Sequence, residues 1–232
     1  MIGCARRDRL AVVCKDQGMG IELVDRDVML VIDVQNDFCD GGALAVPGGQ
    51  DVVPVIHRLA GLFQHLIMTQ DWHPQDHHSF ASNHPGRAPF ETLETDHGGQ
   101  VLWPDHCVQG SMGAAFHPHL HPDHAELILR KGFRKDIDSY SAFRENDRIT
   151  RTGLTGYLRE RGLGRIFLAG LAYDYCVGFS ALDARRLGLK VFVLRDACRA
   201  IDLNGSAAAM EQEFSNSGVL LDESPGLEGR HR

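Results

Sequence analysis

The sequence lacks the excess of positive charge that nucleic-acid-binding proteins usually carry. Its 24 lysine and arginine residues stand against 31 aspartate and glutamate residues, which gives a formal net charge of −7. Because a protein that grips a phosphate backbone is normally basic, we expect no nucleic-acid partner. The sequence also lacks an apolar run near the roughly 20 residues that a membrane-spanning helix needs, so we expect no membrane partner.

Close cysteine pairs are missing as well. The six cysteines form no C-x-x-C motif, and a chain of 232 residues with 43% hydrophobic residues does not need disulfides for its stability. We therefore expect reduced cysteines and a cytoplasmic location. We also expect no secretory signal, because charged residues such as Asp16 and Glu22 interrupt the N-terminal segment. Residues 1–27 are interpreted as an extension of unknown role, and residues 28–232 as a single domain.

From residue 28 onward, short apolar runs alternate with amphipathic segments. Apolar strands separated by helices indicate an α/β fold, in which a parallel sheet is covered on both faces to give three layers. The stretch 72–122 is rich in histidine, proline and glycine and is expected to be a long functional loop. The expected strands are 28–33, 65–71, 126–131, 165–172, 190–196 and 219–221, and the expected helices are 51–64, 152–162, 176–188 and 206–217.

Four chemically capable side chains lie at or just after expected strand ends, where folds of this class bind their ligands. They are Asp33, Asp71, Lys131 and Cys176. Cys176 opens an expected helix, whose dipole favours a thiolate and whose unpaired N–H groups can hold an oxyanion. Asp33 is a candidate base for the thiol proton, and Lys131 is a cation that would stabilise both negative charges. A thiol, a carboxylate and an ammonium group together indicate acyl transfer.

Histidine is abundant, and all but one of the 13 histidines lie between residues 57 and 124. Asp71 and His73 are two residues apart on an expected extended segment, so their side chains point to the same side. His106 is a candidate third ligand. One carboxylate and two imidazoles suit zinc, iron or manganese, and the spacing does not choose among them. Non-haem iron oxygenases use the same ligand set, but that alternative leaves the cysteine, the lysine and the first aspartate without a role.

Seven motifs resemble those of the nicotinamidase branch of the isochorismatase-like cysteine hydrolases: VIDVQNDF, GGALAVPGG, QDWHPQDHHSFA, WPDHCVQ, LRKG, DSYSAF and GLAYDYCV. The resemblance covers about residues 28–222. It implies a six-stranded parallel sheet with strand order 3-2-1-4-5-6. It also implies hydrolysis of nicotinamide to nicotinate and ammonia in NAD salvage, with pyrazinamide as a second substrate. One divalent metal ion is implied, with zinc as the first choice and iron or manganese as alternatives.

The same resemblance assigns roles to individual residues. The positions that match the catalytic set are Asp33, Lys131 and Cys176. The positions that match the metal ligands are Asp71, His73 and His106, with Ser79 contacting the metal through water and His77 less suited to direct contact. A cis peptide bond between Leu171 and Ala172 is implied, and it would aim the Ala172 N–H, beside that of Cys176, at the oxyanion. The expected substrate pocket consists of Phe38, Trp103, Leu44, Tyr140 and Leu171, with Phe38 and Trp103 on either side of the substrate ring.

Two other functions stay open on the sequence alone. One is a different amidase of the same superfamily, acting on a carbamoyl or ureido substrate. The other is a non-catalytic protein that binds a metal or a pyridine, which the intact catalytic positions make the weaker alternative. The sequence is compatible with a homo-oligomer but carries no signal for one.

Overall fold

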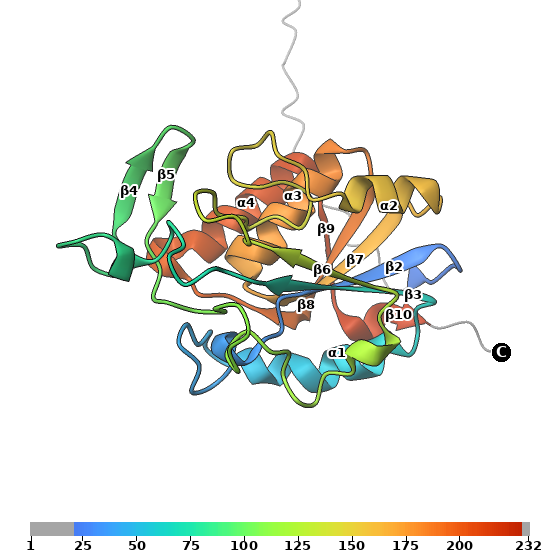
Figure 1. Cartoon of the computed structure of the whole chain (residues 1–232). Helices are drawn as coiled ribbons and strands as arrows, with labels where there is room; N and C mark the ends of the chain where they lie inside the picture. The colour runs from blue at the N-terminus through green and yellow to red at the C-terminus, as the bar shows by residue number, and fades with distance from the viewer. Residues whose placement is uncertain (1–20, 229–232) are drawn as a thin grey trace, which may run out of the picture.

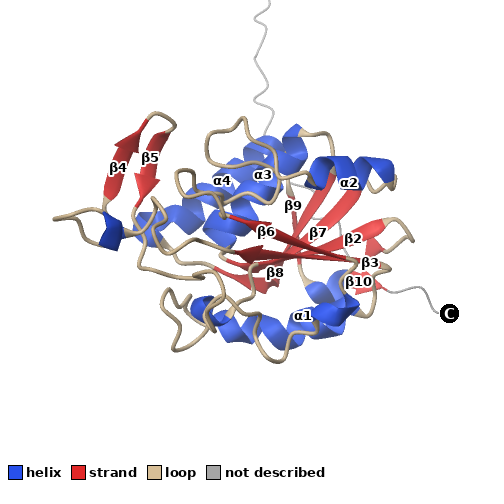
Figure 2. Cartoon of the chain, in the orientation of Figure 1, coloured by secondary structure: helices blue, strands red, loops and turns tan. Residues whose placement is uncertain are grey.

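A twisted sheet of six strands forms the middle layer of the molecule (Figures 1 and 2). The computed structural model describes residues 21–228. Helix α1 (Val52–Ala60) covers one face of the sheet. The other face is covered by α2 (Leu154–Glu160), α3 (Gly178–Arg186) and α4 (Ser206–Ser217). The three layers expected from the sequence are therefore confirmed.

The order of strands in this sheet is β6-β3-β2-β7-β8-β9, and every neighbouring pair is parallel. Counted along the chain within this sheet, that order is 3-2-1-4-5-6, as the family resemblance implies. The chain order reverses between β2 and β7, and the catalytic candidates lie at the carboxyl ends near this point. The strands are β2 (Asp27–Ile32), β3 (His65–Asp71), β6 (Leu127–Lys131), β7 (Arg165–Leu171), β8 (Lys190–Arg199) and β9 (Leu220–Asp222).

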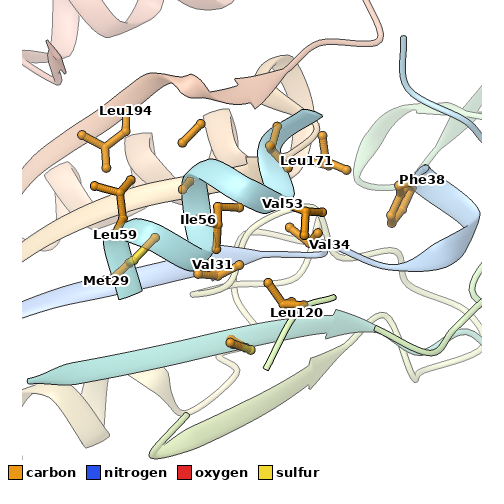
Figure 3. Packing of buried hydrophobic residues seen from close by; sticks show 14 of the residues in the cluster. Met29, Val31, Val34, Phe38, Val53, Ile56, Leu59, Leu120, Leu171 and Leu194 are labelled. Atoms are coloured by element: carbon orange, nitrogen blue, oxygen red, sulfur yellow. The ribbon is translucent and has the colours of Figure 1, made fainter. Parts of the chain in front are cut away.

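Strand β2 is buried on both faces, which explains its unbroken apolar sequence. Its alternate side chains belong to two different cores. Met29 and Val31 pack with Ile56 and Leu59 of α1, as Figure 3 shows. Val28, Leu30 and Ile32 belong to the core on the opposite face, together with Leu158 of α2. The chain that enters the site from β2 is therefore held from both sides.

The stretch 72–122 was expected to be irregular, and this expectation is wrong in one part. Strands β4 (Thr92–Thr95) and β5 (Gly98–Val101) form an antiparallel hairpin. The hairpin projects from the body of the molecule, beyond the arrowheads of β3 and β6 (Figure 1). Its residues are mostly exposed and include a Gly-Gly pair, so they lack the apolar alternation that identifies a half-buried strand.

The ends of several elements differ from those expected. Helix α1 ends at Ala60 rather than near residue 64. The end of the predicted N-terminal extension has regular structure, because β1 (Ile21–Glu22) pairs in parallel with β10 (Leu227–Glu228) and β2 begins at Asp27. The rest of that extension, residues 1–20, lies outside the described residues.

The cysteines that the structure describes form no disulfide bond. Cys39, Cys107, Cys176 and Cys198 are free and buried. Cys4 and Cys14 lie outside the described residues.

Among residues 21–228, the structure contains no helix long and apolar enough to cross a membrane.

Candidate active site

The carboxyl ends of the central strands bring the four predicted residues together. Asp33 follows β2, Asp71 ends β3 and Lys131 ends β6, where it is the register partner of Asp71. Cys176 lies five residues after β7. All four side chains are buried, with at most 6% of any one exposed. Their charges and protons are therefore governed by one another more than by bulk water.

Lys131 is the common neighbour of this group. Its Nζ lies 2.8 Å from Asp33 Oδ2 and 2.5 Å from Asp71 Oδ1. It also donates to the carbonyl oxygen of Ser139 at 2.8 Å and lies 3.4 Å from Cys176 Sγ. One ammonium group thus faces two carboxylates and the thiol.

Asp33 is held by the neighbouring strand. The Thr69 hydroxyl donates to Asp33 Oδ1 at 2.6 Å, and the Asp33 N–H donates to the same hydroxyl oxygen at 3.2 Å. Asp33 has a φ of +48°, in the left-handed region that few residues other than glycine, asparagine and aspartate adopt. Asp33, Asp71 and Cys176 have oxygen or sulfur atoms that all lie within 4.8 Å of one another. The carboxylate is thus fixed within reach of the thiol.

Cys176 does not open an α-helix, which corrects the sequence-based expectation. It lies in a single π-helical turn, Tyr173–Val177, and α3 begins only at Gly178. The Ser180 hydroxyl donates to the Cys176 carbonyl at 2.6 Å and ties this turn to α3. Such turns are rare and are found mostly at functional sites. Cys176 and Ala172 both line the same cavity, and the Leu171–Ala172 peptide bond is cis, as the resemblance implies.

Burial and charge shift the proton affinities of this group in opposite directions. Burial, with a smaller contribution from the Asp71 charge, raises the pKa of Asp33 to about 6 despite the Lys131 ammonium beside it. Burial also raises the pKa of the Cys176 thiol, although Lys131 opposes the shift. Burial alone would lower the pKa of Lys131, but the Asp33 and Asp71 charges outweigh it and raise that pKa well above its usual value. Lys131 is therefore a permanent cation, and the resting thiol keeps its proton.

Asp71, His73 and His106 form a second group directly beside the first. Asp71 Oδ2 lies 3.6 Å from His73 Nε2 and 4.0 Å from His106 Nε2. Because Asp71 uses Oδ1 for Lys131, its other oxygen is directed to the two imidazoles. The three ligand atoms lie within 4.8 Å of one another, an arrangement that could hold a metal ion.

Backbone carbonyls fix the orientation of both imidazoles. His73 Nδ1 lies 2.8 Å from the Gly132 carbonyl oxygen, and His106 Nδ1 lies 2.8 Å from that of Pro104. If each Nδ1 donates its proton to the carbonyl, each Nε2 keeps a lone pair toward Asp71, which is the usual support for metal-binding histidines. Burial lowers the pKa of His106 to about 4, so this ring is neutral and able to bind a metal. These donors fit a divalent cation.

Position 132 requires a glycine because the His73 ring packs directly against its backbone. It has a φ of +66°, and a Cβ added there would lie 2.4 Å from His73 Cε1. Any other residue would therefore displace the imidazole as well as strain the backbone. The glycine of the LRKG motif thus has a structural reason to be a glycine.

Ser79 and His77 contact each other beside the metal candidates. Ser79 Oγ lies 2.7 Å from His77 Nδ1, and both side chains are fully buried. The His77 and His73 rings lie 4.3 Å apart between centroids. His77 also belongs to a second close group of potential ligands, with His73 and Asp138. The water-mediated contact of Ser79 with a metal stays a prediction.

A cavity with an empty volume of about 330 Å³, part of it open to solvent, joins the two groups. Four of the five predicted pocket residues line it, while Leu171 lies behind the wall in the core. Phe38 contacts the ring of His106, with 5.4 Å between centroids, and Trp103 packs edge-on against Tyr175 at 4.9 Å. The lining consists of Phe38, Leu44, Asp71, His73, Trp103, His106, Asp138, Tyr140, Ala172, Tyr175, Cys176 and Ile201.

Some residues that support or line this cavity were not predicted from the sequence. Gln35 clamps the backbone of Asp71, because it donates to the Asp71 carbonyl and accepts from the Asp71 N–H, both at 2.8 Å. Thr69, which holds Asp33, was also missed. Its position in β3, two residues before Asp71, was the available signal. Asp138 lies in an irregular segment, as the first residue of the DSYSAF motif, and Tyr175 lies in the π-helical turn Tyr173–Val177. No periodic pattern marked either residue.

Comparisons with known proteins agree with this architecture. The Isochorismatase domain model matches residues 27–223. A curated nicotinamidase from Acinetobacter baylyi is 52% identical over 191 residues, covering 82% of this chain and 89% of that protein. A solved nicotinamidase/pyrazinamidase from Acinetobacter baumanii is 51% identical, with a TM-score of 0.86 and coverage of 87% of this chain and 98% of that one.

Two further solved structures carry ligands. PnC1 of L. infantum, in complex with nicotinate, is 38% identical, with a TM-score of 0.79 and coverage of 90% of this chain and 98% of that one. The pyrazinamidase of Pyrococcus horikoshii, in complex with zinc, is 32% identical, with a TM-score of 0.69 and coverage of 85% and 99%. These likenesses extend over most of each chain.

Proposed function

The chain belongs to the isochorismatase family, and on that premise we propose that it is a nicotinamidase. This amide hydrolase converts nicotinamide and water into nicotinate and ammonia. The observation that carries the proposal is the placement of Asp33, Lys131 and Cys176 in one buried group, with Cys176 facing a small aromatic pocket. We propose pyrazinamide as a second substrate, because a similar solved relative is named both nicotinamidase and pyrazinamidase.

Acylation begins with a proton transfer between Cys176 and Asp33. The Asp33 carboxylate takes the thiol proton, and the resulting thiolate attacks the amide carbon. Lys131 stabilises the thiolate, since its Nζ lies 3.4 Å from Sγ. The N–H groups of Ala172 and Cys176, two residues that line the pocket, are assigned to the oxyanion of the tetrahedral intermediate.

Collapse of that intermediate breaks the carbon–nitrogen bond. Asp33 returns its proton to the departing nitrogen, which leaves as ammonia, and a thioester remains on Cys176. Asp33 then takes a proton from water as the oxygen attacks the thioester carbon. The carbon–sulfur bond breaks, the thiolate recovers the proton from Asp33, and the acid product loses its own proton to solvent.

The other wall of the pocket binds the substrate ring. Phe38 and Trp103 supply aromatic faces, and Leu44 and Tyr140 complete the wall. We assign Asp71, His73 and His106 to one divalent ion, with zinc as the first choice because a similar pyrazinamidase was solved with zinc. When bound, such an ion supplies a Lewis-acidic position for a ring nitrogen of the substrate.

The cytoplasmic location expected from the sequence stays a prediction.

The proposal is tested by ammonia release from nicotinamide. The purified wild-type enzyme should release ammonia and nicotinate in equal amounts. Cys176→Ala should lose at least about 10³-fold in rate, because the covalent route is removed. Cys39→Ala is the matched control, since Cys39 is also a buried free cysteine but does not line the pocket.

Any one of three results would contradict the proposal. An enzyme that cleaves a ureido or carbamoyl compound but not nicotinamide would overturn the substrate. A Cys176→Ala variant with full activity would overturn the nucleophile. A wild-type protein that binds nicotinate and hydrolyses no amide would be a binding protein only.

A further inference from the structure

The hairpin β4–β5 reaches the active site through a single buried side chain. Gln100 on β5 is only 5% exposed, although its neighbours on the hairpin are largely open to solvent. It does not line the catalytic cavity. It lines instead an adjoining cavity under the hairpin, whose lining shares Asp138 and Tyr140 with the catalytic cavity.

The Gln100 amide holds these two shared residues. Gln100 Nε2 donates to Asp138 Oδ2 at 2.8 Å and lies 3.2 Å from the Tyr140 hydroxyl. Trp103 Nε1 donates to the same hydroxyl at 3.1 Å. One amide group therefore contacts Asp138 and Tyr140 directly and is connected to Trp103 through the Tyr140 hydroxyl. The same Nε2 also donates to the Val101 carbonyl at 2.8 Å.

The network is closed on the far side by Asn146. The Asn146 side-chain amide donates to Gln100 Oε1 at 3.4 Å, and its oxygen accepts the Tyr140 N–H at 3.2 Å. Asp138 Oδ1 accepts the N–H of Ser139, whose carbonyl is bound by Lys131. The hairpin is thereby connected to the loop that carries the pocket wall.

We propose that Gln100 is a positioning residue, and that the hairpin β4–β5 sets substrate-ring size by holding Asp138 and Tyr140 in the pocket wall. The inference rests on the proposed nicotinamidase function and deepens it. Asp138 is a buried carboxylate at the cavity surface, and the Gln100 amide is a donor that fixes its direction. Since Gln100 contacts none of Asp33, Lys131 or Cys176, its effect falls on substrate binding and discrimination rather than on bond breaking.

Kinetics of Gln100→Met test this role. Methionine keeps the length and volume of the side chain but removes both amide donors. We expect KM for nicotinamide to rise about tenfold, which corresponds to about 1.4 kcal/mol of lost substrate binding to the displaced wall, while kcat stays within about threefold. Without the Gln100 hydrogen bonds, the pocket wall should also accept a larger ring. The ratio of kcat/KM for nicotinamide to kcat/KM for quinoline-3-carboxamide should therefore fall by about tenfold.

A double variant with the hydrogen-bond donor and acceptor exchanged, called the reversed pair, tests whether KM and ring preference can be restored. Gln100→Glu alone places a second carboxylate beside Asp138 and should raise KM further than Gln100→Met. In the double variant Gln100→Glu/Asp138→Asn the donor and acceptor exchange places, and KM and ring preference should recover relative to Gln100→Glu. Glu94→Gln, an exposed change on the same hairpin, should leave every parameter unchanged.

The outcomes separate the inference from the proposed function. If the wild type hydrolyses nicotinamide but Gln100→Met changes only the unfolding temperature, Gln100 is merely structural and the inference fails. The inference fails equally if kcat falls at constant KM, or if the reversed pair recovers nothing. If the wild type itself does not hydrolyse nicotinamide, it is the proposed function that fails.

Discussion

Asp33 and Asp71 share one ammonium group, and this links the candidate base to the candidate metal site. Lys131 Nζ lies 2.8 Å from a carboxylate oxygen of Asp33 and 2.5 Å from one of Asp71. The second oxygen of Asp71 faces the imidazoles of His73 and His106. A change in charge at either carboxylate is therefore felt by the other, through contacts that water does not screen.

Removal of this cation should impair both stability and activity. In Lys131→Met the two carboxylates keep their burial but lose their partner, which typically costs about 3–5 kcal/mol of unfolding free energy. We expect that loss in denaturant unfolding, together with a fall of about 10³-fold or more in kcat/KM for nicotinamide.

The matched control for this prediction is Lys135→Met. Lys135 pairs with Asp76 at the surface, where both side chains are more than half exposed, and such pairs contribute about 0–1 kcal/mol. If Lys131→Met were as stable and as active as this control, the shared ammonium would have no role.

The acid limb of the pH–rate profile should report Asp33. Burial raises the pKa of this carboxyl to about 6, and the mechanism needs it ionised to accept the thiol proton. Activity should therefore be full above this pKa and decline as the pH falls through about 6, as measured by kcat/KM between pH 4.5 and 8.

Asp33→Asn should abolish the reaction across this range, since asparagine accepts no proton. Asparagine tolerates the left-handed backbone that Asp33 adopts, so this variant should remain folded. An unchanged acid limb in a residually active Asp33→Asn protein would assign the limb to another group.

Chelation should inactivate the enzyme reversibly. Asp71, His73 and His106 fit one divalent cation, so a strong chelator should remove about one equivalent of metal, as measured by elemental analysis, and activity should fall with it. Zinc, iron or manganese added singly should show which ion restores the reaction.

Two histidine variants separate this site from the other histidines. After dialysis, His106→Ala should contain far less metal than the wild type. This measurement of metal content does not depend on enzyme activity. His119→Ala, at an exposed position, should retain the wild-type amount. Equal metal content in the two variants would contradict the ligand assignment.

Gly132→Ala should weaken the metal site from outside the ligand set. The added Cβ would lie 2.4 Å from His73 Cε1, and the positive φ of 66° adds backbone strain. We expect lower metal content and lower unfolding free energy. The same substitution in α2, Gly156→Ala, meets no atom within 4 Å and should stabilise by about 0.5–1 kcal/mol. Two variants with equal metal content would show that His73 does not depend on this glycine.

The sequence predicted the sheet and much of the site because both depend on strong local signals. The apolar runs identified all six strands of the large sheet, and their ends carried Asp33, Asp71 and Lys131. The strand order came from the family resemblance, not from the runs themselves. Parallel strands present their carboxyl ends at one edge, so residues far apart in the chain could be grouped from the sequence alone.

The remaining features were missed for physical reasons. The hairpin β4–β5 has a mostly exposed, polar and glycine-containing sequence. Its stability comes from the pairing of its two strands, and this pairing leaves no apolar pattern in the sequence. The π-helical turn at Cys176 is one turn long and merges with α3 in sequence. Gln100 and Asp138 act through hydrogen bonds in three dimensions, and residue type alone does not distinguish them from surface polar groups.

The position of Lys131 has one more consequence, which concerns the cost of moving the first proton. Before transfer, Lys131 faces a charged Asp33 at 2.8 Å; after transfer, it faces a charged Cys176 sulfur at 3.4 Å. The total charge around the ammonium is the same in both states, and the cation need not move to serve either. The site therefore behaves as a solvent that is already arranged for the product of the step, which keeps the reorganisation energy small.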